Sequence, residues 1–325
     1  NRRVHGMAEK QYRIGIDLGG TNIKVGVIDA DNRLLGKLSM KTRPLGRDWH
    51  LVVADMAAQV NHLLEELDIA VEECIKIGVG SPGMVDHIAG VVTYAGNFEW
   101  EYVPLLAELR CSFPHMPMRL ANDANCAVLG EAVAGAAKGA RHVVLITLGT
   151  GVGGGVIVDG RLQEGGSAGG MELGHTLLKL DGELCTCGRH GCLEAYASAS
   201  ALTRQARAAA EGDKHSAMHA LCGGNLGNMN GIIPFKAARQ GDQTAQRVVD
   251  TYIRYLGEGI INFINIWRPE KVLLGGGVSN EGPPLIDPLN DYVRPRAFGG
   301  ERGYVAPVVQ ATLGNDAGLI GAASL

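Results

Sequence analysis

Three glycine-rich turns are the residues of this sequence that most readily suggest chemistry. They are Gly19-Gly20-Thr21, Gly149-Thr150-Gly151 and Gly275-Gly276-Gly277, and each follows a β-rich run. A glycine without Cβ lets backbone N–H groups approach phosphate oxygens, and a threonine hydroxyl adds a donor. Any one of these turns could be only a tight hairpin or a close crossing. Three together favour a site for a phosphorylated ligand.

The sequence around the first turn indicates the kind of phosphate chemistry. No Gly-Lys-Ser/Thr follows any of the turns at the P-loop spacing, and none of them has the Rossmann pattern with its downstream acidic residue. Asp17 is instead placed to hold a hydrated Mg²⁺ near the β- and γ-phosphates of a nucleotide. Its alternative role is to cap a turn. The predicted nucleotide-binding residues are Asp17, Gly19, Gly20, Thr21, Asn22, Lys24, Thr150, Gly151, Gly275, Gly276 and Gly277.

One histidine and three cysteines lie within eighteen positions. His175, Cys185, Cys187 and Cys192 match a tetrahedral Cys3His zinc site with four protein ligands, which predicts a structural metal rather than a catalytic one. Unligated, reduced thiols are the alternative. The odd total of seven cysteines argues against a disulfide framework, and most of the other four are expected to be small core residues.

Three carboxylates lie close to these motifs in the sequence. Glu172 precedes His175 by three positions and Glu194 follows Cys192 by two, so both could support the metal site or accept hydrogen bonds from a polyhydroxylated ligand. Asn122-Asp123 ends a short apolar run before an alanine-rich stretch, where helix capping is the simplest explanation. In a cleft opposite phosphate turns, Asp123 would be a general base for a substrate hydroxyl.

The elements that must position these residues alternate between strands and helices. Strands are predicted over residues 12–18, 23–28, 34–38, 75–80 and 271–274. Apolar residues at three- and four-residue intervals predict helices that begin at Trp49 and that cover Thr244 to Trp267. The class is therefore α/β.

A repeat displaced by 130 positions organises the chain. Ile16-Asp17-Leu18-Gly19 returns as Ile146-Thr147-Leu148-Gly149, and Val27-Ile28-Asp29 returns as Ile157-Val158-Asp159. This distance is too long for a solenoid unit, so we expect two lobes that each begin with one hairpin. The predicted lobes are residues 7–120, joined by a C-terminal helix over 316–325, and a larger lobe over 121–315 that holds the zinc site.

Composition excludes several classes of protein. The 325 residues are 46% hydrophobic and 20% charged, with a net charge of −4, scattered basic residues and no run of five or six like charges, which disfavours a nucleic-acid partner. No apolar stretch reaches the roughly 18 residues of a membrane span, so we expect a cytoplasmic protein without a membrane partner. Residues 1–6, ahead of Met7, are left out of the fold reasoning as an expected upstream remnant.

Several segments together resemble the ROK family of sugar kinases. These are Asp17-Leu-Gly-Gly-Thr21, Asn122-Asp-Ala-Asn125, Thr150-Gly-Val-Gly-Gly154, Glu172-Leu-Gly-His175 and Cys185-Thr-Cys-Gly-Arg-His-Gly-Cys-Leu-Glu194. The resemblance implies an actin-like (ribonuclease H-like) two-lobed kinase fold with an interlobe cleft, and it implies ATP, Mg²⁺ and a structural Zn²⁺ as cofactors. It also implies a homodimer or homotetramer.

The resemblance turns the open roles into definite expectations. Asp123 becomes the catalytic base, while Asn122, Glu172, His175 and Glu194 hold sugar hydroxyls, with the second ring nitrogen of His175 on zinc. Gly83 and Asn97 match family sugar-binding regions more loosely.

Asn97-Phe-Glu-Trp100 and Val103-Pro104-Leu105 resemble the glucokinase branch, which predicts transfer of a phosphoryl group to the 6-hydroxyl of glucose. Kinases for N-acetylmannosamine, N-acetylglucosamine, fructose or allose remain alternatives, as does a sugar-binding sensor without catalysis. A repressor is not expected, because only about ten residues precede Tyr12 and no basic patch is present.

Overall fold

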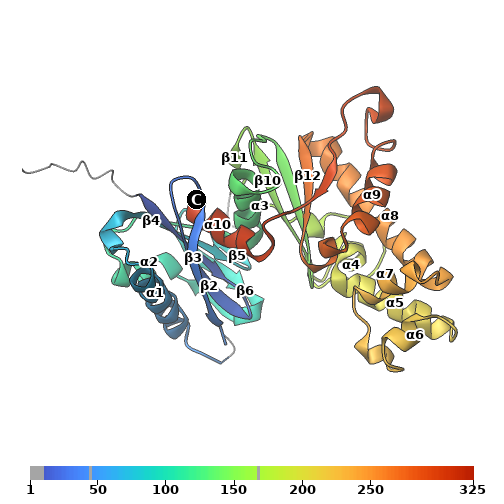
Figure 1. Cartoon of the computed structure of the whole chain (residues 1–325), viewed down its shortest axis with the longest axis horizontal. Coiled ribbons are helices and arrows are strands. Elements are labelled where there is room, and N and C mark those ends of the chain that lie inside the picture. Colours follow the sequence, from blue (N-terminus) through green and yellow to red (C-terminus); the bar gives the residue numbers. More distant parts are fainter. Residues whose placement is uncertain (1–10, 44–45, 167–168) are drawn as a thin grey trace, which may run out of the picture. The chain divides into compact units, whose positions relative to one another are not determined.

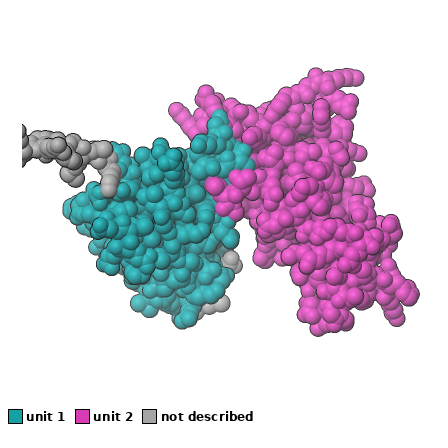
Figure 2. All heavy atoms as spheres, viewed as in Figure 1, with its two compact units in different colours: residues 1–139, 162–171, 315–325 teal, residues 140–161, 172–314 magenta. Residues whose placement is uncertain are grey.

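The computed structural model describes residues 11–43, 46–166 and 169–325 (Figure 1). The chain divides into two compact units, which Figure 2 colours separately. Unit 1 contains the chain up to residue 139 together with residues 162–171 and 315–325, and unit 2 contains residues 140–161 and 172–314.

Unit 1 is built on a five-stranded sheet in the order β3-β2-β1-β4-β8. The strands are β1 (Tyr12–Leu18), β2 (Asn22–Ile28), β3 (Leu34–Lys41), β4 (Cys74–Ser81) and β8 (Met118–Asn122). The first three are antiparallel neighbours, as the predicted hairpin meander requires, while β4 and β8 run parallel to β1. The predicted strands over 12–18, 23–28, 34–38 and 75–80 are thus confirmed, with ends that differ by up to three residues.

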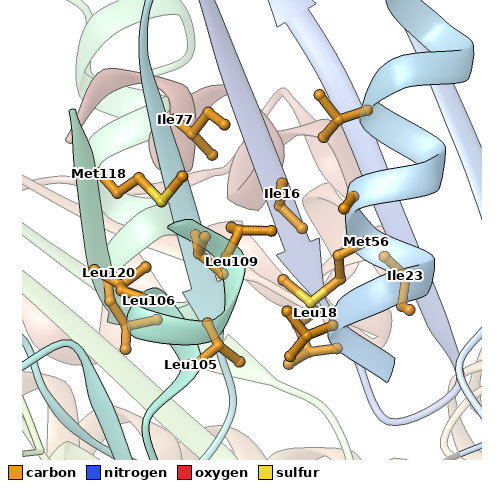
Figure 3. Close-up of a cluster of buried hydrophobic side chains, with 14 of the residues drawn as sticks. Ile16, Leu18, Ile23, Met56, Ile77, Leu105, Leu106, Leu109, Met118 and Leu120 are labelled. Carbon is orange, nitrogen blue, oxygen red and sulfur yellow. The ribbon is translucent and has the colours of Figure 1, made fainter. Parts of the chain in front are cut away.

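One face of this sheet is covered by α1 (Trp49–Glu66) and α2 (Leu105–Ser112), with a hydrophobic core beneath them. Figure 3 shows Ile16 and Ile77 of the sheet meeting Met56 of α1 and Leu109 of α2. Side chains alternate between the faces of a strand, so the neighbouring Gly15 and Gly78 face the other side. There a Cβ on either glycine would collide with the backbone of α10 (Ala317–Ser324). The glycines let this helix lie directly on the strands.

Unit 1 also has a small antiparallel sheet that the sequence analysis did not predict. It contains β5 (Met84–Asp86), β6 (Val91–Ala95) and β7 (Trp100–Val103), with a short 3-10 helix over Gly96–Phe98 between the last two strands. The strands have only three to five residues, too few for a clear alternation to appear in the sequence.

Unit 2 repeats the hairpin arrangement in a second five-stranded sheet, ordered β11-β10-β9-β12-β13. Its strands are β9 (Val143–Leu148), β10 (Val152–Val158), β11 (Arg161–Leu162), β12 (Lys271–Gly275) and β13 (Val308–Gln310). The antiparallel pair β9–β10 corresponds to β1–β2, and β12 runs parallel to β9 as β4 does to β1. Each unit therefore begins its sheet with the hairpin that the repeat predicted.

The helices of unit 2 are α4 (Glu194–Ala197), α5 (Ala199–Gly212), α6 (Met218–Leu221), α7 (Ile233–Arg239), α8 (Gln243–Trp267) and α9 (Pro283–Val293). The longest, α8, confirms the predicted helix to within one residue. It begins where the Asp242 side chain accepts hydrogen bonds from the N–H groups of Thr244 and Ala245, and it ends at Arg268 in the left-handed conformation. No helix in the described part of the chain is long and apolar enough to cross a membrane.

The compact units differ from the predicted lobes in two places. Residues 121–139, which include α3 (Asp123–Ala134), and residues 162–171 belong to unit 1 rather than to the larger lobe. The reason is that α3 packs closely on α10, where a Cβ on Gly130 or Gly321 would collide with the backbone of the facing helix. The C-terminal helix is also part of unit 1.

Candidate functional site

The unit 1 part of the candidate site lies at the carboxyl ends of three parallel strands. Asp17 of β1 pairs in register with Gly80 of β4, and Ser81 pairs with Asn122 of β8. The parallel register brings residues from three distant segments to one edge of the sheet. Such an edge is the usual place for ligands in open α/β sheets.

The first glycine turn has its own charge pair. Lys24 Nζ lies 3.1 Å from Asp17 Oδ2 across the β1–β2 hairpin. The turn is closed by Gly19 N–H, which donates to Asn22 O at 2.9 Å, and Thr42 Oγ1 donates to Gly19 O at 2.6 Å. The edge thus presents a cation and a carboxylate together, beside a backbone fixed by hydrogen bonds.

Asn122 and Asp123 stand at the start of α3. Asn122 Oδ1 accepts a hydrogen bond from Ala124 N–H at 2.9 Å, so the capping role considered for this segment is present. Asn122 Nδ2 also donates to Gly83 O at 3.1 Å. Asp123 is the first helical residue, and its Oδ1 lies 2.8 Å from Ala124 N. Both side chains thus lie at the N-terminal turn of α3.

A buried thiol lies close to both carboxylates. Cys126 is fully buried in α3, and burial raises the pKa of its thiol well above the ordinary value, with Asp17 and Asp123 adding to the effect. The thiol is therefore neutral at physiological pH. It packs here as the small core residue that the sequence indicated.

Gly83 and Asn97, which match the family's sugar-binding regions more loosely, lie near the small sheet. Gly83 has a φ of +83°, and a Cβ there would collide with Tyr94 O of β6. The position therefore requires glycine, and its carbonyl is the one that Asn122 binds. Asn97 lies in the 3-10 helix over Gly96–Phe98, but its side chain is outside the described part of the structure.

In unit 2 the other two glycine turns are neighbours. Gly275 pairs in register with Thr147 of β9, just before the turn at Gly149. Gly276 has a φ of +82°, and a Cβ there would collide with Leu148 O. The parallel pairing of β9 with β12 thus brings together two turns that are 126 positions apart in the sequence.

The predicted zinc ligands converge into one cluster. The ligand atoms of His175, Cys185, Cys187 and Cys192 all lie within 4.8 Å of one another. Cys187 Sγ and Cys192 Sγ are 3.7 Å apart, and Cys185 Sγ is 3.5 Å from His175 Nδ1. A tetrahedral zinc with bonds of about 2.3 Å to sulfur and 2.0 Å to nitrogen requires separations of roughly 3.8 and 3.5 Å. The donor set therefore fits zinc, with Nδ1 as the histidine ligand atom.

The protonation of these thiols also bears on metal binding. Burial raises the pKa of Cys185 to about 12 and also raises that of Cys192, whereas the backbone N–H of Arg189 lowers the pKa of Cys187. Only the thiolate binds zinc, so metal binding must release protons from the two buried thiols.

Glu172 and His175 are held against β10. His175 ends the 3-10 helix Leu173–His175, which begins directly after Glu172. A Cβ on Gly174 would collide with Val152 O, so this glycine allows the segment to lie on the strand. Burial raises the pKa of Glu172. The charge of His175 lowers this pKa, and the charge of Glu194 raises it further.

Glu194 makes contacts that the sequence analysis did not foresee. Its carboxylate is buried, and Oε2 accepts a hydrogen bond from Val152 N–H at 3.0 Å. Oε1 accepts from Thr186 Oγ1 at 2.5 Å and lies 3.4 Å from Cys185 Sγ. Thr186 was missed because only its place between two metal ligands distinguishes it in the sequence. Glu194 thus connects the metal cluster to the Gly149–Val152 turn.

A surface cavity in unit 2 is separate from all of these residues. It has a volume of about 730 Å³ and lies beside α5 and α8, where Tyr196, Arg204, Arg247 and Tyr255 are among its lining residues. No predicted site residue lines it.

Comparison with known proteins identifies the family. The model of the ROK family matches residues 13–325. The chain belongs to the ROK family. A glucokinase from Thermotoga maritima is 38% identical over 320 residues, which cover 96% of each chain. The resemblance drawn from the motifs is confirmed.

Solved ROK structures have the same fold. A ROK glucokinase from Streptomyces griseus, in complex with glucose and AMPPNP, superposes with a TM-score of 0.81 at 36% identity and covers 96% of this chain and 98% of its own. The predicted actin-like α/β fold is thereby confirmed. A ROK transcriptional regulator, a homolog of the E. coli MLC protein, has a TM-score of 0.82 at 25% identity, with 97% of this chain and 77% of its own covered. The ROK fold thus occurs in both kinases and regulators, and function must be argued from the site residues.

Proposed function

We propose that this ROK protein is a glucokinase that transfers the γ-phosphoryl group of ATP to the 6-hydroxyl of glucose. The observation that carries the proposal is the convergence of Asp17, Asn122 and Asp123 at the carboxyl ends of β1, β4 and β8. The glucokinase relatives, one with glucose and an ATP analogue bound, support the choice of substrates.

In this proposal Asp123 is the catalytic base. The sugar 6-oxygen attacks the γ-phosphorus in line, and the bond to the β,γ-bridging oxygen breaks, which gives glucose 6-phosphate and ADP. Asp123 accepts the proton of the hydroxyl. The residue stands at the N-terminus of α3, where its Oδ1 lies 2.8 Å from Ala124 N. Asn122 both caps this helix and fixes the Gly83 carbonyl, and we assign the two residues to the sugar site with Asn97.

Phosphate-binding roles are assigned within each unit by itself: in unit 1 to the first glycine turn and the Asp17–Lys24 pair, and in unit 2 to the other two glycine turns. Asp17 fits a hydrated Mg²⁺, because its carboxylate is partly exposed at the strand edge. The ion would supply positive charge that neutralises the phosphates. Lys24 supplies a second positive charge. Unit 1 offers backbone N–H and hydroxyl donors from Gly19, Gly20, Thr21 and Asn22. Unit 2 offers donors of the same kinds from Thr150, Gly151 and Gly275 to Gly277.

We assign the metal cluster a structural role, which is to hold in place the residues that bind the sugar. His175, Cys185, Cys187 and Cys192 would hold a zinc ion with four protein ligands, and such a metal would support the structure rather than take part in the reaction. With Nδ1 facing the thiols, Nε2 of His175 is left for a sugar hydroxyl. Glu172 and Glu194 flank this residue and supply further acceptors.

We also propose that the protein works in the cytoplasm as a homodimer or homotetramer. All seven cysteines are free thiols, a state that the reducing cytoplasm preserves. Light scattering of the purified protein measures its oligomeric state, and a monomeric mass would contradict this part of the proposal.

The test is a coupled ADP-release assay with MgATP and six sugars. Glucose, N-acetylmannosamine, N-acetylglucosamine, mannose, fructose and allose are compared at equal concentrations. We expect a strong preference for glucose, and preference for another sugar would change the substrate but not the mechanism. Asp123→Asn is expected to lower kcat by about 10² to 10⁴ with sugar binding largely retained. Near-normal turnover in this variant would remove Asp123 as the base.

A sensor of sugars without catalysis is the second candidate, favoured by the close superposition on the transcriptional regulator. The same assay separates the two functions. Calorimetric binding of a sugar without ADP release from any of the six would support the sensor and contradict the kinase.

A further inference from the structure

The carboxylate of Glu194 joins two parts of unit 2 that the sequence separates. We call residues 185–192 with His175 the metal knot, and residues 149–152 the phosphate turn. Glu194 Oε1 accepts from Thr186 Oγ1 of the metal knot at 2.5 Å, while Oε2 accepts from Val152 N–H of the phosphate turn at 3.0 Å. A Cβ on Gly151 would collide with Oε2, so the turn lies directly against this carboxylate.

The same segment holds the other end of the turn. Ala199 N–H, just beyond α4, donates to Gly149 O at 2.8 Å. Gly149 N–H donates in turn to Gly151 O at 3.0 Å, which closes the loop on itself. The chain from Glu194 to Ala199 therefore holds the phosphate turn at both of its ends.

Thr186 is the metal-knot residue with the closest hydrogen bond to Glu194. Its hydroxyl donates to Glu194 Oε1 at 2.5 Å, whereas Cys185 Sγ lies 3.4 Å from the same oxygen and sulfur is a weak donor. The position of Thr186 in the chain is set by Cys185 and Cys187 on either side, which both belong to the Cys3His cluster.

We infer that Thr186 is a positioning residue that, through Glu194, transmits the geometry of the metal knot to the phosphate turn. The metal knot then serves the nucleotide as well as the sugar, so a fault in it changes the KM for ATP together with the KM for glucose. A knot that acted on the sugar alone would leave the KM for ATP unchanged. This inference rests on the proposed glucokinase function, although its first test below does not.

The experiment compares Thr186→Val, Thr186→Ser and the matched control Thr203→Val. Valine preserves the shape of threonine but removes the hydroxyl, and serine restores the hydroxyl. Thr203 Oγ1 donates to Ala199 O within α5, so its variant tests the same change of side chain without Glu194. Zinc content is measured in each protein, and we expect one zinc per chain throughout.

The first readout is hydrogen exchange at the Val152 amide, which requires no activity. We expect exchange about tenfold faster in Thr186→Val, the size expected when a hydrogen bond to a charged group is lost. Thr186→Ser should return to the parent rate, and Thr203→Val should not differ from it. An unchanged rate in zinc-loaded Thr186→Val, or no recovery with serine, would overturn the inference.

The second readout is the KM for each substrate. We expect Thr186→Val to raise the KM for ATP and the KM for glucose by about three- to tenfold each, with a smaller change in kcat. A rise for glucose alone would overturn the coupling to the phosphate turn. A parent protein that phosphorylates no sugar would refute the proposed function, while the Val152 exchange would still decide the inference.

A second variant covers the case in which Thr186→Val does not retain zinc. Glu194→Gln keeps the size of the side chain but loses the charge that binds Val152 N–H and Thr186. With zinc retained, its Val152 exchange must also accelerate. Parent-like exchange in that variant would overturn the inference.

Discussion

The two repeated hairpins have the same backbone arrangement but obtain their polar groups in different ways. At an offset of 130, Asp17 and Lys24 of β1–β2 correspond to Thr147 and Gly154 of β9–β10. The first hairpin carries an ion pair across its own strands. The second carries no charge at these positions and lies instead against the carboxylate of Glu194, which comes from α4.

This difference explains why the two hairpins need different surroundings. The turn of the first hairpin is closed by Asn22, three positions after Gly19, and by Thr42, which directly follows the neighbouring strand β3. The small residues of the second hairpin allow neighbouring segments to approach, as Gly151 does toward Glu194 and Gly154 toward Leu173. One hairpin supplies charge, and the other supplies backbone donors that its neighbours hold in place.

Among the changes that test this comparison of hairpins, removing the charge of the first hairpin has the largest expected effect. Asp17→Asn should lower kcat by about 10² to 10³, the usual loss when one electrostatic contact to a reacting group is removed. The equivalent change in the second hairpin, Thr147→Val, should leave kcat within about twofold. Steady-state kinetics with glucose and MgATP measures both, and equal losses in the two variants would remove the proposed distinction.

The second prediction concerns the metal that we propose for the Cys3His cluster beside the second hairpin. Cys187→Ser, or chelation of the parent protein, should lower the Tm by about 5 °C or more and raise the KM for glucose, since binding energy from the metal is also folding energy. Calorimetry and elemental analysis check this. A metal-free protein with the parent Tm and full activity would contradict the structural role.

The smallest predicted effect concerns the space beside Glu194. Gly151→Ala should destabilise the protein by about 1 to 3 kcal/mol, because the new Cβ would collide with Oε2 and displace the carboxylate. Gly149→Ala is the matched control in the same turn, since a Cβ there meets nothing within 4 Å. Its free energy of unfolding should change by less than about 0.5 kcal/mol. Denaturant unfolding compares them, and equal destabilisation would show that the contact with Glu194 is not the cause.

Local patterns were sufficient to predict the long elements and the metal cluster. The apolar intervals of Trp49–Glu66 and Gln243–Trp267 are those of amphipathic helices, so both were predicted correctly. Three cysteines within eight residues need only a short loop to converge on one ion. The strands of the small sheet were not predicted, because three to five residues give no clear period.

The predicted lobes were less accurate for a physical reason. Nothing in the residues around Leu120 marks a boundary, and the membership of α3 follows from its packing on α10, nearly 200 positions away. The sequence does not show why position 130 is a glycine, because the reason is the close approach of α10, which is distant in the chain.

The sequence by itself determined the family, the α/β class, the two repeated hairpins and the four residues of the Cys3His cluster, since each depends on residue types at short or fixed spacing. Only the tertiary structure decided that the capping residue Asn122 also binds Gly83, and that Glu194 joins Thr186 to Val152. These contacts connect segments up to 42 positions apart. Their partners are set by strand register and helix packing, which no local pattern of residues encodes.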